Sequence, residues 1–134
     1  IHDLAAALPE PFDGFVLCGN NMGLLASRDE APPFLAALAG LAKPGATLVG
    51  TWLDPYMTDK IDHLAYHQWN RERGRMGGQL CIRSRHRNLA SPWFDYLFCS
   101  PAEAEELIAG TAWELAELNR DERGPGYNVL LRLS

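Results

Sequence analysis

The chain has 134 residues, of which 47% are hydrophobic, and it carries a formal net charge of −5 at pH 7. This length supports one domain with a hydrophobic core, and the composition argues against a disordered chain. The acidic balance argues against nucleic-acid binding, and no apolar run reaches the roughly 18 residues that a membrane-spanning helix requires.

Three cysteines, Cys18, Cys81 and Cys99, form no C-x-x-C pair. They therefore predict reduced thiols in a cytoplasmic protein. All three fall in predicted strands, where a free cysteine usually behaves as a small buried hydrophobe.

The first predicted strand ends in a tight bend. Phe15–Cys18 is an unbroken apolar run, typical of a strand that is buried on both faces in a parallel sheet. Gly19, Asn20 and Asn21 follow it, and glycine and asparagine tolerate positive φ. Because ligands of open α/β sheets bind outside the carboxyl ends of the strands, we expect the functional site at this bend. Asp13 lies at the opposite end of the strand, which predicts a structural role.

A helix and a second strand follow the bend. Asp29 can cap the helix, and Lys43-Pro44-Gly45 is a typical helix stop. Residues 46–52 (ATLVGTW) then predict a buried strand that is parallel to the first. Asp54 and Tyr56 leave this strand at the end where the bend lies, so either could contact a substrate. The alternative is an ordinary proline-containing loop.

The next predicted helix is capped by Thr58 and buries Ile61, Leu64 and Trp69 on one face. His63 and His67 fall elsewhere on it with i, i+4 spacing. No H-E-x-x-H motif and no third ligand accompany them, so we predict no metal site. A substrate contact or a general base is one interpretation, and a solvated helix face is the other.

The second half of the chain predicts an antiparallel hairpin over residues 79–87 and 93–99, with a turn at 88–92. Alternation places Arg83, Arg85 and Arg87 on one face, reinforced by Arg71, Arg73 and Arg75; this stripe could select an anionic substrate or simply face solvent. Ser100 and Glu103 have capping-box spacing before a helix to about residue 109. Strands at 113–119 and 127–133 then form an antiparallel pair.

Two motifs carry a family resemblance. FD-x-F-x-x-x-GNN-x-G, followed by a helix and L-x-K-P-G-A-x-L-x-G, resembles the C-terminal half of a class I S-adenosylmethionine-dependent methyltransferase. The bend is similar to the "GNS" of small-molecule methyltransferases related to glycine N-methyltransferase. The closing helix and antiparallel strands also resemble the end of that family's domain.

The resemblance implies a partial Rossmann-like methyltransferase sheet, made of its later strands, with an added antiparallel hairpin and a C-terminal antiparallel strand pair. It implies S-adenosylmethionine as cofactor, a small-molecule substrate, and no nucleic-acid or membrane partner. The residues that it suggests are Cys18, Gly19 and Asn20 for the cofactor, Asn20, Tyr56 and His63 for catalysis, and Asn21, Asp54, Arg83 and Arg85 for the substrate.

The family's glycine-rich turn and ribose-binding carboxylate are not found in the sequence. We therefore expect residues 1–134 to form one partial domain that by itself binds S-adenosylmethionine negligibly and is inactive or nearly so. The first strand would then be a sheet edge, which predicts a homodimer through that edge. The alternative is a non-catalytic binding or assembly module built on the same half-sheet.

Overall fold

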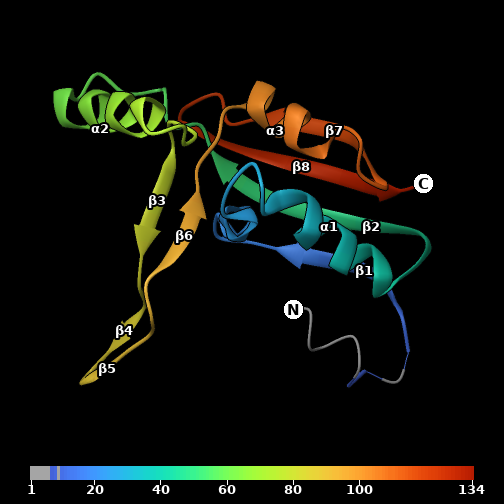
Figure 1. Cartoon of the computed structure of the whole chain (residues 1–134). Coiled ribbons are helices and arrows are strands. Elements are labelled where there is room, and N and C mark those ends of the chain that lie inside the picture. The colour runs from blue at the N-terminus through green and yellow to red at the C-terminus, as the bar shows by residue number, and fades with distance from the viewer. Residues whose placement is uncertain (1–6, 9) are drawn as a thin grey trace.

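The computed structural model describes residues 7, 8 and 10–134 (Figure 1). In chain order the elements are β1 (Phe12–Leu17), the 3-10 helix η1 (Asn21–Leu25), α1 (Ala31–Gly40), β2 (Ala42–Leu53), α2 (Ile61–Glu72), β3 (Gln79–Ile82), β4 (Arg85–His86), β5 (Leu89–Ala90), β6 (Phe94–Leu97), α3 (Pro101–Ile108), β7 (Trp113–Arg120) and β8 (Gly126–Leu133).

Four of these strands form one mixed sheet in the order β1-β2-β8-β7 (Figure 1). β1 and β2 are parallel, with Val16 opposite Val49. β8 is antiparallel both to β2 and to β7. The α/β class, the parallel pair and the C-terminal antiparallel pair are therefore confirmed.

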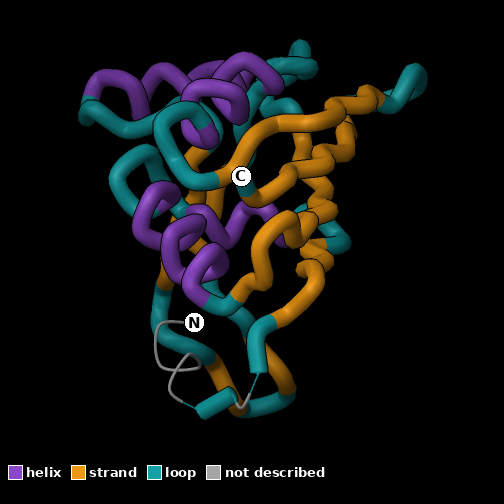
Figure 2. The backbone as a smooth tube through the Cα atoms, turned by 90° about the vertical axis from the view of Figure 1, so that its right-hand side faces the viewer, coloured by secondary structure: helices purple, strands orange, loops and turns teal. Residues whose placement is uncertain are grey.

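α1 and α3 cover one face of this sheet (Figures 1 and 2). Two buried tryptophans fasten the layers, since each indole N–H finds a main-chain acceptor in the core. Nε1 of Trp52 donates to the carbonyl of Leu97 at 3.1 Å. Nε1 of Trp113 donates to the carbonyl of Leu35 at 2.9 Å. Trp52 thus connects β2 to the end of β6, and Trp113 connects β7 to α1.

The other face of the sheet is open in the part of the chain that the structure describes. The side chains of Val16 and Val49, which lie opposite one another on this face, are 69% and 43% exposed. The prediction that the first strand is buried on both faces is therefore wrong at Val16, and the predicted burial of the second strand is wrong at Val49. In the first strand, Phe15 and Leu17 pack against the core on the covered face, and Val16 projects from the open face.

Two glycines allow η1 to lie directly against β2 and β6. A Cβ atom at Gly50 would lie 2.3 Å from Sδ of Met22, and one at Gly23 would lie 2.3 Å from a ring carbon of Tyr96. Both distances are shorter than packed side chains allow. The turn that follows β1 can therefore reach both the sheet and the hairpin.

The boundary between α1 and β2 lies earlier than the sequence predicts. α1 ends at Gly40, and Lys43-Pro44-Gly45, the predicted helix stop, already belongs to β2. Nζ of Lys43 lies 2.9 Å from Oδ2 of Asp13, so the start of β2 is paired with the start of β1. Asp13 thus forms an exposed ion pair at the end of the sheet opposite the bend, where the sequence predicted a structural role.

α2 begins after Lys60 and ends at Glu72, and it turns its apolar face outward. The buried face is polar, because Nδ2 of Asn70 donates to the carbonyls of Gly77 at 2.9 Å and Gln79 at 2.8 Å. These carbonyls belong to the chain that leaves the helix and would otherwise lack donors. The predicted burial was therefore wrong for three residues: Ile61 is 81% exposed, Leu64 49% and Trp69 42%.

The predicted hairpin is confirmed as an arm that leaves the sheet (Figure 1). β3 pairs antiparallel with β6, and β4 with β5. The turn is shorter than expected: Arg87, at φ 54°, and Asn88 connect β4 to β5, so Leu89 is already paired.

Four of the six arginines of the predicted stripe have aromatic or acidic partners. Arg83 stacks over Trp93 on the arm, 4.8 Å from the ring centroid. Arg71 lies over the Tyr56 ring, Arg73 lies over Trp69, and Arg75 pairs with Asp95. The stripe as a contact for an anionic substrate stays a prediction.

The three cysteines are free, as expected, but only Cys99 is buried. Cys18 follows β1 and is exposed, and Cys81 is exposed on β3. Burial raises the pKa of the Cys99 thiol well above its usual range. Within the described ranges, no helix has the length and apolar character needed to cross a membrane.

Candidate functional site

The bend after β1 has the backbone that its sequence predicts. Gly19 and Asn20 both adopt positive φ, at 66° and 64°. The amide of Asn20 donates to Oγ1 of Thr51 on β2 at 2.7 Å, and its carbonyl accepts a hydrogen bond from the Tyr96 hydroxyl on β6. Neighbouring elements therefore hold a left-handed backbone that the local chain would not maintain alone.

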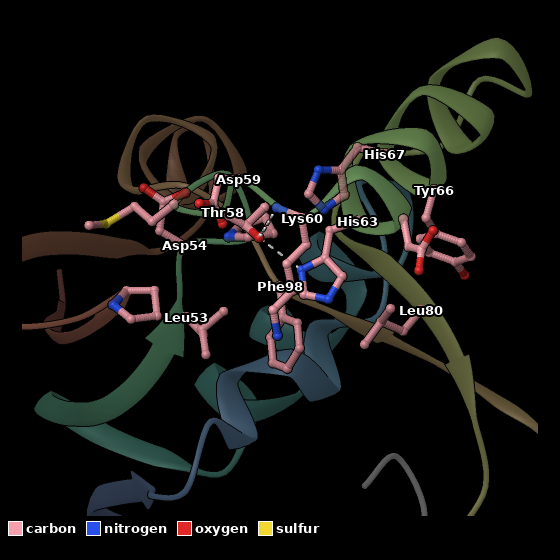
Figure 3. Close-up of a pocket in the computed structure, with 14 residues that line it drawn as sticks. Leu53, Asp54, Thr58, Asp59, Lys60, His63, Tyr66, His67, Leu80 and Phe98 are labelled. Carbon is pink, nitrogen blue, oxygen red and sulfur yellow. Dashed lines mark hydrogen bonds between the residues drawn. The ribbon is translucent and has the colours of Figure 1, made fainter.

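A pocket of about 770 Å³ opens beside the carboxyl end of β2 (Figure 3). The loop after β2 and the first turns of α2 form most of its wall, and the β3–β6 arm and the β7–β8 turn close it. It is lined by Leu53, Asp54, Pro55, Met57, Thr58, Asp59, Lys60, Asp62, His63, Tyr66, His67, Leu80, Phe98 and Pro125.

Two aromatic rings connect the bend with this pocket. Tyr96, whose hydroxyl meets Asn20, packs edge-on against Phe98 with ring centroids 5.7 Å apart. Phe98 lines the pocket, as does Leu80, which lies opposite Tyr96 in the register of β3 and β6. Movement of the arm would therefore disturb the bend and the pocket together.

Two histidines of α2 line the pocket in different environments (Figure 3). His63 is exposed, and its Nδ1 lies 3.0 Å from Oγ1 of Thr58. His67 is only 7% exposed and packs edge-on against Tyr56, with ring centroids 5.2 Å apart. Burial, with a smaller contribution from the Arg71 guanidinium, lowers the pKa of His67, which favours the neutral imidazole.

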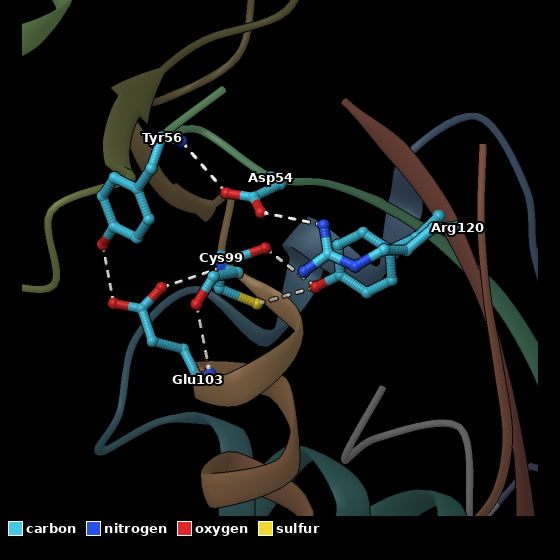
Figure 4. A network of polar contacts seen from close by, with 7 residues as sticks. Asp54, Tyr56, Cys99, Glu103 and Arg120 are labelled. Carbon is cyan, nitrogen blue, oxygen red and sulfur yellow. Dashed lines mark hydrogen bonds and ion pairs between the residues drawn. The ribbon is translucent and has the colours of Figure 1, made fainter. Parts of the chain in front are cut away.

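A polar network fixes the loop that follows β2 (Figure 4). Oδ1 of Asp54 accepts a hydrogen bond from the amide of Tyr56 at 3.1 Å, and Oδ2 lies 3.5 Å from Arg120 on β7. The Tyr56 hydroxyl donates to Oε1 of Glu103 at 2.6 Å. Burial and this carboxylate raise the pKa of Tyr56 to about 12. The phenol therefore stays protonated and acts as a donor.

Glu103 connects this network to the start of α3. Its Oε2 accepts from the amide of Ser100 at 2.9 Å, and the Ser100 hydroxyl accepts from the amide of Glu103, which completes the predicted capping box. One carboxylate thus caps a helix and anchors the loop of the pocket.

The structure brings together some of the predicted site residues. Asp54 and His63 both line the pocket, and Tyr56 lies behind His67. Arg83 and Arg85 lie on the arm, outside the pocket lining. The remaining residues gather at the bend: Cys18 follows β1, Gly19 and Asn20 form the turn, and Asn21 begins η1.

Asn20 also lines a second hollow, of about 320 Å³, on the side of Thr51 and Arg120. The bend therefore lines this hollow, whereas none of its residues lines the pocket beside β2. Gly19 has no atom within 4 Å of the position that a Cβ would occupy, so its surface is open.

From the sequence, Tyr96 was one of several aromatic residues that could roof a pocket or belong to the core, Phe98 had no predicted role, and His67 shared the alternatives given for His63. A usable signal was the spacing of His63, His67 and Asn70, a polar stripe at helical period. Such a stripe marks a face turned toward polar groups, and here the main chain and the pocket supply them. Nothing in the sequence signalled that Tyr96 reaches Asn20, because 76 positions separate them.

Within the described residues, no group of three or more histidine, cysteine, aspartate or glutamate side chains could hold a metal ion. No protein-family model matches the chain. No curated protein matches its sequence.

Solved structures, in contrast, resemble it closely in fold. A SAM-dependent methyltransferase from Bacteroides fragilis, in complex with S-adenosyl-L-homocysteine, has a TM-score of 0.71 at 16% identity over 95% of this chain and 50% of that chain. A SAM-dependent methyltransferase from Methanosarcina mazei has a TM-score of 0.64 at 14% identity, over 96% and 64%. The methyltransferase CcbJ from Streptomyces caelestis has a TM-score of 0.59 at 16% identity, over 99% and 73%.

The chain spans 50% and 64% of the first two of these proteins. At such identities the likeness concerns the fold. The described residues therefore have the fold of part of a SAM-dependent methyltransferase domain.

Proposed function

We propose that this chain is part of an S-adenosylmethionine-dependent methyltransferase that acts on a small molecule. One observation carries the proposal: the bend after β1 and the pocket beside β2 lie at the carboxyl ends of two parallel strands, where open α/β sheets bind ligands. The Tyr96–Phe98 pair connects them. The resemblance of the fold to methyltransferases supports the same assignment.

The bend fits one wall of a cofactor site. Gly19 offers an open main-chain surface, and no hydrogen bond engages the side-chain amide of Asn20 within the described residues. We assign Cys18, Gly19 and Asn20 to this wall. S-adenosylmethionine, when bound, supplies an electrophilic methyl group on a sulfonium.

The pocket beside β2 is assigned to the acceptor. Asp54 and His63 line it, and Asn21 lies on the side of the bend, so these three are the proposed acceptor contacts. Tyr56 orients the site, because its hydroxyl is already committed to Glu103. Arg83 and Arg85 lie on the arm, outside the lining of this pocket. Positioning and exclusion of water are the main demands of an in-line methyl transfer.

We also propose that the protein forms a homodimer in the cytoplasm. Within the described residues β1 pairs only with β2, so its outer edge has free main-chain groups. The three free thiols support a reducing compartment.

The cofactor assignment is tested by titrating the ¹⁵N-labelled chain with S-adenosyl-L-homocysteine and following the amide resonances. We expect shifts centred on Cys18, Gly19 and Asn20 at millimolar ligand only, and negligible binding at micromolar ligand, because the sequence has no glycine-rich turn. The proposal fails if millimolar ligand shifts only amides remote from the bend, or none.

A further inference from the structure

We propose that the arm binds an acidic, extended segment of a partner protein, which adds to the arm as a further β-strand. The segment would bind along the outer edge of β3 and β4, at Cys81, Arg83 and Arg85, which we call the arm edge. These residues lie outside the proposed acceptor pocket and away from the bend after β1. The arm edge is therefore a surface separate from the proposed methyl-transfer site.

The first half of the arm turns alternate main-chain groups toward its second half. The carbonyl of Gly78 accepts a hydrogen bond from the amide of Phe98 at 2.9 Å. Six residues later, the carbonyl of Ser84 accepts one from the amide of Ser91, also at 2.9 Å. Successive residues of a strand direct these groups to opposite sides, so residues two apart face the same way. The even-numbered residues 78–84 therefore face the inside of the arm.

The residues of the arm edge consequently direct their main-chain groups outward. Within the described residues β3 pairs only with β6, and β4 only with β5, so no strand lies on this side of Cys81, Arg83 and Arg85. Gln79, which faces the same way, shows the demand for a partner, because its carbonyl accepts from Nδ2 of Asn70 at 2.8 Å. A free edge of this kind can template the addition of another strand.

The charge of the arm selects an acidic strand. Residues 83–93 contain three arginines and one histidine but neither aspartate nor glutamate, in a chain whose net charge is −5. Arg83 and Arg85 are exposed, and neither forms an ion pair within the described ranges. Their side chains, two positions apart, share one face of the strand. Carboxylates at alternate positions of an added strand would lie opposite both arginines.

The far end of the arm offers apolar contacts for the same segment. Figure 1 shows β4 and β5 at the end of the arm that is remote from the four-stranded sheet. Leu89 is 70% exposed and Trp93 62% exposed, although the Trp93 ring also supports the Arg83 guanidinium at 4.8 Å. A segment that alternates acidic and apolar residues would therefore find a partner for each kind of side chain.

The same features disfavour other occupants of the arm edge. Two copies of the arm would bring like charges together, which is how charged edges normally prevent pairing with one another. A nucleic acid or an anionic bilayer extends beyond the arm and would meet the acidic remainder of the chain, with screening only over a Debye length of about 8 Å. Neither supplies main-chain groups to the free edge.

The proposal is tested with the end-blocked peptide Thr-Glu-Val-Glu-Val-Glu-Thr and with its control, in which lysine replaces each glutamate. Binding is followed through the amide resonances of the unaltered chain. We expect the glutamate peptide to bind about tenfold more tightly, to shift the amides of Cys81, Arg83 and Arg85, and to slow their hydrogen exchange. Equal affinities, or shifts confined to the pocket beside β2, would overturn the proposal.

Strand addition is tested by N-methylation of the glutamate peptide. Methylation of its glutamate amides blocks one edge of the extended peptide, and methylation of its valine amides blocks the other. We expect one of these two forms to bind about tenfold more weakly than the parent peptide and the other to retain most of the affinity. Equal effects of the two modifications would refute pairing through the main chain.

The role of the arginines is tested by Arg85→Glu, which should weaken binding of the glutamate peptide about tenfold and strengthen binding of the lysine peptide. Arg123→Glu is the matched control, because Arg123 is exposed in the turn between β7 and β8, far along the chain from the arm. It makes the same change in net charge and should leave both affinities unchanged. Equal effects of the two variants would overturn the assignment to the arm edge.

Other occupants are distinguished in the same experiments. Tighter binding of a short oligothymidylate, or of phosphatidylserine vesicles, than of the glutamate peptide would overturn the choice of a protein segment. Self-association that Arg85→Glu abolishes and Arg123→Glu does not would assign the arm edge to a second copy of the chain instead.

Discussion

The hydroxyl of Tyr96 donates a hydrogen bond to the main-chain carbonyl of Asn20. Asn20 is a residue with positive φ, and Tyr96 is on the arm that also carries Phe98 into the pocket. One side chain therefore connects the strand-end bend, where the cofactor wall is proposed, with the wall of the acceptor pocket. The relationship explains how an inserted hairpin can belong to a site at the end of the sheet.

Tyr96→Phe should loosen this connection while it preserves the ring. The lost hydrogen bond should lower the free energy of unfolding by about 1 kcal/mol, and hydrogen exchange at the amides of Asn21 and Gly23 should become faster. Denaturant unfolding and exchange measurements test both effects. Tyr66→Phe is the matched control, because the Tyr66 hydroxyl makes no hydrogen bond within the described residues. Equal stability losses in the two variants would refute the proposed importance of the contact.

Gly23→Ala should be damaging at the same junction. The new methyl group would lie 2.3 Å from a ring carbon of Tyr96, so the arm or η1 must shift. We expect a loss of about 1–3 kcal/mol in the free energy of unfolding, as for other overpacked sites. Gly40→Ala at the end of α1 is the control, since no atom lies within 4 Å of its Cβ position, and it should be neutral or slightly stabilising. Chemical denaturation of both variants compares them, and a neutral Gly23→Ala would contradict the packing.

The sequence predicts the sheet well where hydrophobic periodicity agrees with the turn and capping residues that bound each element. The apolar runs of β1 and β2, the Gly19–Asn20 bend and the capping box at Ser100 all depend on residues close to one another in the chain. Such local signals predict elements and their order, and the order limits which strands can be parallel. The prediction failed for α2, where apolar spacing suggested burial but the main chain after the helix required the amide of Asn70.

The candidate site was predictable only in part, because long-range contacts decide it. Asp54 was predicted because it directly follows β2, and His63 because of its i, i+4 spacing with His67; both line the pocket. Tyr96 and Phe98 reach the site through the pairing of β3 with β6. The register of that pairing cannot be predicted from the sequence of either strand alone. Burial of His67 depends likewise on how α2 packs against the loop of Tyr56.

Tyr56→Phe should separate the pocket loop from α3. Its hydroxyl bond to Glu103 is charge-assisted and half-buried, so we expect a loss of about 1–2 kcal/mol in the free energy of unfolding near neutral pH. The capping bonds between Ser100 and Glu103 should remain, so the helix signal in circular dichroism of the folded variant should not change. A loss of helix signal would assign Tyr56 a larger role in folding.

The same variant has a pH signature. The pKa of Tyr56 is about 12 in the folded chain, against about 10 in an unfolded one, so the folded state retains the phenol proton longer. The stabilisation is complete below pH 10 and declines as pH rises toward 12. The difference in unfolding free energy between wild type and Tyr56→Phe should therefore shrink over this range in urea titrations. A difference that grows with pH would contradict the donor role of the phenol.

The free edge of β1 predicts self-association. Unpaired main-chain groups beside Val16, an apolar side chain that is 69% exposed, favour pairing with a second β-strand. Light scattering during size-exclusion chromatography should give twice the chain mass of 14.9 kDa. Val16→Glu should shift the protein to the monomer, because a pair related by a two-fold axis would bring two carboxylates together. Ile61→Glu, at an 81% exposed position on α2, should leave the dimer intact. A wild-type monomer at high concentration, or equal dissociation by both variants, would exclude pairing through β1.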